Sequence, residues 1–148
     1  MKFTTLIILI LFSTTIFTYD KGKNPSSMTE TEFVNLETKF KQQIKQKPEN
    51  KEYLVKLAHL YLINSKYSKA VKAYQEAIIV DPKDSKLFAG IAMSYIHLGQ
   101  YKMAKMMANE ALAIDPKFEH ASKLITYINR KQELLRNAQE SDKINKEK

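Results

Sequence analysis

The sequence has no cysteine and no tryptophan, and only three glycines and four prolines among 148 residues. The absence of cysteine excludes disulfide bonds, thiolate zinc sites, iron–sulfur ligation, cysteine nucleophiles and lipid attachment through a thiol. The low glycine content, together with abundant Lys, Ala, Leu and Ile, favours helices over strands. The hydrophobic share of 44% and the charged share of 27% are ordinary for one folded domain.

The sequence also contains little that could support catalysis. We find no glycine-rich phosphate loop and no G-x-S-x-G elbow for a serine nucleophile. The three histidines, His59, His97 and His120, fall on three different predicted helices, and none has an H-x3-H partner for zinc. We therefore predict a protein that is not an enzyme and that binds no cofactor and no metal.

Basic residues outnumber acidic ones by 24 to 16, a formal net charge of +8. The densest basic stretch runs from Lys39 to Lys56, on a predicted amphipathic helix and the turn that follows it. This stretch offers no interleaved aromatic platform of the kind that single-stranded nucleic acids stack on. We interpret it as a solvated face and predict no nucleic-acid partner.

The N-terminus has the layout of a secretory signal peptide. Lys2 precedes an apolar run over residues 3–12, which becomes rich in threonine before the polar Tyr19-Asp20-Lys21. The run over 3–18 is 16 residues, shorter than the about 20 residues of a membrane-spanning helix. We predict cleavage near Thr18. Because no A-x-A-like box is present, an uncleaved signal-anchor over 1–18 is the alternative. Residues 19–29, with Lys, Gly, Asn, Pro and Ser, predict an exposed linker.

The most informative pattern is an internal repeat of 34 residues. When residues 51–84 are aligned with 85–118, nine positions are identical, whereas unrelated segments of this length would share about two. The identical pairs are Ala58/Ala92, Tyr61/Tyr95, Tyr67/Tyr101, Ala70/Ala104, Glu76/Glu110, Ala77/Ala111, Asp81/Asp115, Pro82/Pro116 and Lys83/Lys117.

Each copy predicts a helix–turn–helix. Apolar residues recur with helical spacing in two runs per copy, the runs are separated by a short polar break, and Asp-Pro closes the copy. Gly99 suits the left-handed position after the first helix of the second copy. In the first copy, we expect Ser65 to act as the N-cap of the second helix.

These residues resemble the tetratricopeptide repeat family, whose signature is W-x2-L-G-x2-Y…A-x3-F…P. The first copy matches it as Leu54-x2-Leu57-Ala58-x2-Tyr61…Ala70-x3-Tyr74…Pro82. The second copy matches it as Phe88-x2-Ile91-Ala92-x2-Tyr95…Ala104-x3-Ala108…Pro116. The resemblance implies an all-α fold, a helix–turn–helix solenoid of about six helices that forms a short right-handed superhelix.

The flanks extend the predicted array to a domain over 30–140. A capping box formed by Thr29 and Glu32 opens an N-terminal helix over 30–47, which ends before Pro48. A polar capping helix is predicted over 119–140, where the repeat signature is lost. Residues 141–148 are predicted to be a charged, disordered tail.

The family resemblance implies that the first helix of each repeat lines a concave groove, which would bind a peptide or protein. The candidate groove residues are Val55, His59, Ala89, Met93, His97, Lys123, Tyr127 and Arg130. Met93 and Tyr127 are the expected apolar anchors, while Lys123 and Arg130 would meet an acidic group of the ligand. The alternative is that the apolar groove residues pack against neighbouring helices and the basic ones are only solvated.

One ligand class within the family is disfavoured. Repeat domains that grip the C-terminal carboxylate of chaperones use Lys, Asn and Arg at five places, and none of the five matches here. Those places hold Val55, His59, Gly90, His120 and Leu124.

The sequence thus predicts an exported, periplasmic or secreted scaffold of the bacterial cell envelope that binds a partner protein of unknown identity. The absence of an N-x-[ST] sequon with a permitted middle residue favours a bacterial origin. Two alternatives remain open. One is a subunit of an envelope complex anchored in the inner membrane through residues 3–18, and the other is a structural protein that associates with itself.

Overall fold

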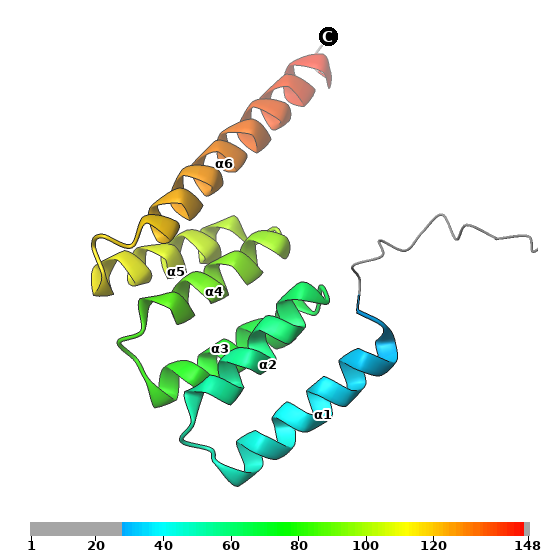
Figure 1. The fold of residues 1–148 in the computed structure, drawn as a ribbon. Coiled ribbons are helices and arrows are strands. Elements are labelled where there is room, and N and C mark those ends of the chain that lie inside the picture. Colours follow the sequence, from blue (N-terminus) through cyan, green and yellow to red (C-terminus); the bar gives the residue numbers. More distant parts are fainter. Residues whose placement is uncertain (1–27, 147–148) are drawn as a thin grey trace, which may run out of the picture.

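The computed structural model describes residues 28–146, and this range contains six helices and no strand (Figure 1). The bounds are α1 Glu30–Gln46, α2 Lys51–Ile63, α3 Tyr67–Val80, α4 Ser85–His97, α5 Tyr101–Ile114 and α6 Glu119–Lys146. The all-α fold predicted from the repeat pattern is confirmed. The predicted signal peptide over 1–18 and most of the predicted linker, residues 19–27, lie outside the described residues.

Consecutive helices pack side by side and form a solenoid (Figure 1). The pairs α2–α3 and α4–α5 are the two helix–turn–helix units, and α3 also packs against α4. α1 covers the open side of α2, and α6 contacts both α5 and α4. Each element therefore touches mainly its neighbours in sequence, which is the property that defines a repeat solenoid.

Side-chain caps set the starts of three helices. The predicted capping box is present at α1, where Thr29 Oγ1 accepts from the Glu32 backbone N–H and the Glu32 carboxylate accepts from the Thr29 N–H. Asn50 caps α2 and Asp84 caps α4 through the same kind of acceptor. These bonds satisfy N–H groups that have no partner within the helix.

The two turns inside the repeats have the same backbone geometry. Ser65 has φ 56° and Gly99 has φ 71°, and these residues are equivalent in the 34-residue alignment. In each turn two backbone bonds close the first helix, such as Lys66 N–H to the Tyr61 carbonyl. The prediction that Ser65 is an N-cap is wrong. Lys66 precedes α3, and Ser65 occupies the left-handed position that Gly99 fills in the second repeat.

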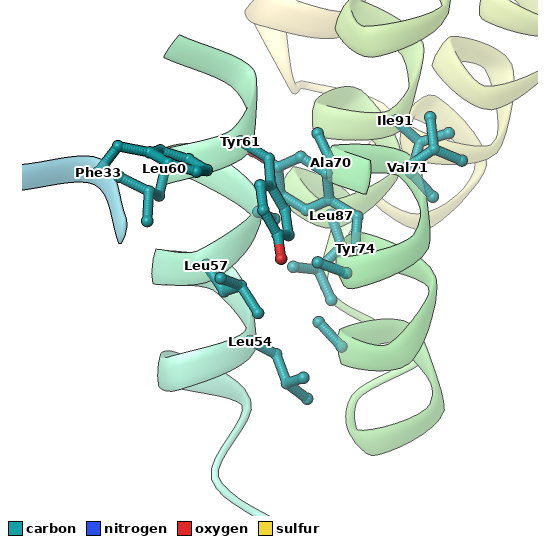
Figure 2. Packing of buried hydrophobic residues seen from close by; sticks show 13 residues of the cluster. Phe33, Leu54, Leu57, Leu60, Tyr61, Ala70, Val71, Tyr74, Leu87 and Ile91 are labelled. Atoms are coloured by element: carbon teal, nitrogen blue, oxygen red, sulfur yellow. The ribbon is translucent and has the colours of Figure 1, made fainter. Parts of the chain in front are cut away.

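The core lies between the helices and is built from large apolar side chains that pack against alanines. Figure 2 shows Leu54, Leu57 and Tyr61 of α2 directed toward α3. Ala58, Ala70, Ala92 and Ala104 are fully buried, so the helix backbones approach closely at these points. Burying each Leu or Tyr side chain stabilises the fold by about 2 kcal/mol.

Tyr74 and Gly90 are in close contact where the two repeats meet. The Tyr74 ring is 2% exposed and lies against the backbone of α4 at Gly90. A Cβ atom placed on Gly90 would lie 2.4 Å from Tyr74 Cζ, which is far inside van der Waals contact. Gly90 is therefore the residue that leaves room for the Tyr74 ring between α3 and α4.

An ion pair links the start of the first repeat to its end. Lys51 Nζ lies 2.5 Å from Asp81 Oδ2 and 2.7 Å from Asp84 Oδ2. The bond from Lys51 lowers the pKa of Asp81, and the two carboxylates raise the pKa of Lys51. Since these groups are open to solvent, we assign the pair an orienting role for the α3–α4 turn rather than a large share of stability.

The predicted boundaries differ from the structure at both ends. α6 does not stop at 140 but continues to Lys146, so most of the segment expected to be a disordered tail is helical. The reason is local: residues 119–146 contain no Gly or Pro and are rich in helix-forming Lys, Leu, Glu and Gln. At the other end, Met28 packs against the core although the prediction placed it in an exposed linker.

The turn geometry predicts the effect of exchanging the two equivalent residues. Ser65→Gly should raise the free energy of unfolding by about 0.5–1 kcal/mol, because a left-handed backbone costs an L-residue more than glycine. Gly99→Ser should lower it by a similar amount. Chemical denaturation of both variants checks this, and a loss of stability in Ser65→Gly would contradict the assignment of strain to Ser65.

A second prediction concerns the Tyr74–Gly90 contact. Gly90→Ala should destabilise the fold by about 1–2 kcal/mol, because overpacking exceeds the gain of about 1 kcal/mol in helix propensity. In a Tyr74→Leu background the same change should cost much less. A double-mutant cycle of unfolding free energies measures this coupling. Equal costs in both backgrounds would show that Gly90 is not required by the Tyr74 ring.

Candidate peptide-binding groove

A cavity of about 280 Å³ opens between α2, α4 and the start of α6. We call it the groove cavity. Its walls combine apolar side chains with three basic groups at the edge. The lining residues are His59, Leu62, Ile63, Tyr74, Lys86, Ala89, Gly90, Met93, Phe118 and His120.

The floor of the groove cavity is formed where the two repeats meet. Tyr74 reaches it from α3 through the gap that Gly90 leaves in α4. The His59 ring stands edge-on to the Tyr74 ring, with centroids 5.9 Å apart. Burial raises the pKa of Tyr74 to about 12, so its hydroxyl stays neutral. The cavity therefore exists only because both repeats contribute to it.

The rim of the groove cavity carries basic and apolar groups that are open to solvent. Lys86, His59 and His120 are exposed, and the His120 ring lies 6.0 Å from the Phe118 ring. Ile63, at the same rim, is 70% exposed. An apolar floor with a basic rim suits a ligand that presents one bulky apolar side chain near an acidic group.

Three of the eight predicted groove residues line the groove cavity. His59 stands at the rim, and Met93 is half-buried against the second core cluster while still facing the cavity. Ala89 also lines it but is 2% exposed, so it forms part of the wall and is not available as surface. Ala89 was predicted to lie in the groove, and there its methyl group also packs in the cluster with Ala121 and Leu124.

The other five predicted residues are not brought around this cavity. Val55 is half-buried against the first core cluster. The His97 ring stacks on the Tyr67 ring at 4.6 Å, so its face is occupied by the adjacent helix. On α6, Lys123 pairs with Glu119 at 2.7 Å.

The last two predicted residues lie farther along α6. Tyr127 is 45% exposed, with Lys131 Nζ 5.7 Å from its ring. Arg130 is exposed. Neither lines the groove cavity, so the predicted site splits into a part inside the cavity and a part along α6.

The main residues that sequence reasoning missed are Tyr74 and Phe118. Tyr74 was assigned to the core alone, since it sits at a signature position of the second helix. Phe118 precedes α6, outside any helical period. Gly90 and His120 were singled out only as places of the chaperone clamp, and both line the cavity. The alignment of the repeats thus indicated where these residues lie, although it did not indicate what they bind.

Among residues 28–146, no group of three His, Asp or Glu side chains is placed to hold a metal ion. None of the helices in this part of the chain combines the length and hydropathy needed to cross a membrane.

Comparison with known proteins gives a match for the repeats. The family model described as tetratricopeptide repeat matches residues 51–84 and 85–118. No curated protein matches the chain. The boundaries of the two matches are those of the 34-residue repeat found by aligning the sequence with itself.

Solved structures show the same fold. The chain is similar to the second TPR domain of human RPAP3, in complex with an HSP70 peptide, with TM-score 0.62, 25% identity and coverage of 68% of this chain and 83% of that chain. The Sgt2 TPR domain from Aspergillus fumigatus gives TM-score 0.65, 22% identity and 72% coverage of each chain.

A third similar structure is PcrH in complex with the chaperone binding region of PopD. It gives TM-score 0.56, 14% identity and coverage of 74% of this chain and 82% of that chain. Together with the family match, these similarities establish that residues 51–118 are two tetratricopeptide repeats.

Proposed function

We propose that this protein is a non-catalytic adaptor that holds a segment of a partner protein against α2 and α4. The observation that carries the proposal is the groove cavity, whose apolar floor of Tyr74 and Met93 is shared by both repeats. A pocket with apolar walls and a few polar groups at its edge is the usual form of a site for a side-chain anchor.

The solved relatives support a peptide or protein ligand. One domain of human RPAP3 is in complex with an HSP70 peptide, and PcrH is in complex with a region of PopD. In this chain, the places of the chaperone clamp hold no Lys, Asn or Arg. We therefore propose a ligand anchored by an apolar side chain with an acidic neighbour near Lys86, and not a chaperone C-terminus.

We further propose that the adaptor works in the bacterial cell envelope, in the periplasm or outside the cell. The support is the sequence of residues 1–18, with its short basic start and apolar run. A version anchored in the inner membrane through residues 3–18 is the second candidate, favoured by the absence of an A-x-A-like cleavage box.

The groove proposal predicts which substitutions weaken binding. The partner is first captured from the native envelope by crosslinking, identified and produced in pure form. Met93→Ala should then weaken its binding by about 1–2 kcal/mol, which is the range of an interface anchor, while the protein stays folded. Lys86→Glu should mainly slow association, because a charge at the rim steers encounter.

Tyr127→Ala is the matched control, because Tyr127 is exposed on α6 and lies outside the groove cavity. Calorimetry or surface plasmon resonance with the purified partner measures all three variants. If Tyr127→Ala abolishes binding while Met93→Ala leaves it intact, the working surface is α6 and the groove cavity is not the site.

The export proposal predicts the N-terminus of the mature protein. Protein purified from the native host should begin between about Ser13 and Gly22, as expected after removal of a signal peptide. N-terminal sequencing checks this. Recovery of an intact Met1 from the membrane fraction would instead establish the anchored form.

A further inference from the structure

A second cavity lies on the other side of α2, between α1 and α3, and has a volume of about 380 Å³. We call it the outer cavity. Leu57 and Tyr61 line it from α2, whereas His59 and Ile63 of the same helix line the groove cavity. At 100° per residue these pairs fall on opposite faces of the helix. A ligand in one cavity therefore leaves the other free.

The floor of the outer cavity is apolar and its rim is mostly basic. Ile44 of α1 and Ala73 of α3 complete the floor with the two α2 residues. The rim is formed by Lys41, Lys69, Lys72 and Glu76.

Comparison with the second repeat shows that a large side chain is absent from the floor of the outer cavity. Ala73 is equivalent to Met107, and Met107 packs against both core clusters. The rest of the floor is apolar in both repeats, since Leu57 and Tyr61 correspond to Ile91 and Tyr95. The first repeat thus has the same apolar surroundings. It has Ala73, however, where the second repeat packs the unbranched side chain of Met107. Relative to the second repeat, the first repeat lacks the part of a methionine side chain beyond Cβ, which would occupy only a fraction of the cavity volume of about 380 Å³.

The rim of the outer cavity also differs between the two repeats. Lys69 and Lys72 stand where the second repeat has Met103 and Met106. Both lysines are exposed at the mouth of the outer cavity. An apolar opening bordered by ammonium groups favours an apolar side chain whose neighbours carry carboxylates.

The acidic groups of α1 and α3 match the lysines around the outer cavity only in part. Glu37 Oε1 accepts hydrogen bonds from Lys41 Nζ and from the Tyr61 hydroxyl, both at 2.7 Å. The Lys41 bond lowers the pKa of Glu37, so this carboxylate stays ionised and is matched mainly by Lys41. Lys69 Nζ is farther from Glu37, at 3.7 Å. Counting Glu37 and Glu76 against the three lysines leaves one net positive charge at the outer cavity.

We propose that the outer cavity is a second binding site, for an acidic segment of a partner protein that inserts one unbranched apolar side chain of methionine size. The size of the inserted side chain is inferred from the equivalent Met107. The negative charge of the ligand residues beside it is inferred from Lys69 and Lys72. The site is independent of the groove cavity, so its test does not depend on the adaptor proposal.

The probe is the blocked pentapeptide Asp-Glu-Met-Glu-Asp, added to the isotope-labelled full chain and followed by amide NMR. We expect saturable shifts at Ile44, Leu57 and Ala73. A peptide with Gly in place of Met, or with Lys in place of the acidic residues, should bind at least about 10-fold more weakly, a difference of about 1.4 kcal/mol.

Two variants copied from the second repeat are the matched tests. Ala73→Met should occupy the floor of the outer cavity, block insertion of the peptide's methionine and abolish the saturable shifts. The double variant Lys69→Met with Lys72→Met should weaken binding about 10-fold. The double variant changes only exposed residues, so it serves even if Ala73→Met does not fold. Met93→Ala, in the groove cavity, should leave these shifts unchanged.

Three results would overturn the proposal. One is the absence of saturable shifts at the three amides, and another is undiminished peptide binding by a folded Ala73→Met variant. The third is saturation of the outer cavity by decanoate but not by the peptide, which would assign the site to a fatty acid. Peptide shifts confined to His59 and Met93 would place the ligand in the groove cavity. That result would contradict the outer-cavity proposal but not the proposed function of the groove cavity.

Discussion

The close approach of helices at buried alanines is the constraint on which the rest of the structure depends. Ala58, Ala70, Ala92 and Ala104 have no exposed surface, and aromatic and aliphatic side chains fill the spaces between them. Larger residues at these points would push the helices apart, since a packed core responds to a single added methylene. The spacing they fix brings Tyr74 against Gly90, and that contact joins the two repeats.

Both cavities follow from this packing. The groove cavity forms where Tyr74 passes α4 and reaches the side lined by His59 and Met93. The outer cavity forms where the repeat places an alanine, Ala73, at a position that Met107 fills one repeat later. Two repeats of similar sequence thus have different surfaces, because the helices keep the same spacing while single side chains differ.

The sequence was sufficient to predict the helices and their order, because period, turn residues and Asp-Pro pairs are all local signals. It also placed His59 and Met93 on one face, and both line the groove cavity. It misassigned Ser65, since a left-handed serine has no signature apart from its alignment with Gly99. The cavity residues Tyr74 and Phe118 could not be predicted, because they reach the site through tertiary packing. The end of α6 was missed because its last turns are exposed, and such a helix end is set by local propensity rather than by packing.

The central claim is that a partner inserts an apolar side chain between α2 and α4. The most direct measurement is photo-crosslinking in the native host from a photoreactive residue placed at Ile63, on the rim of the groove cavity, or at Leu134, on α6. Ile63 is 70% exposed and Leu134 is 55% exposed, so a difference in crosslinking would not be due to a difference in solvent exposure. The account predicts one strong crosslinked partner from Ile63 and none from Leu134. The same partner captured from Leu134 and not from Ile63 would contradict it.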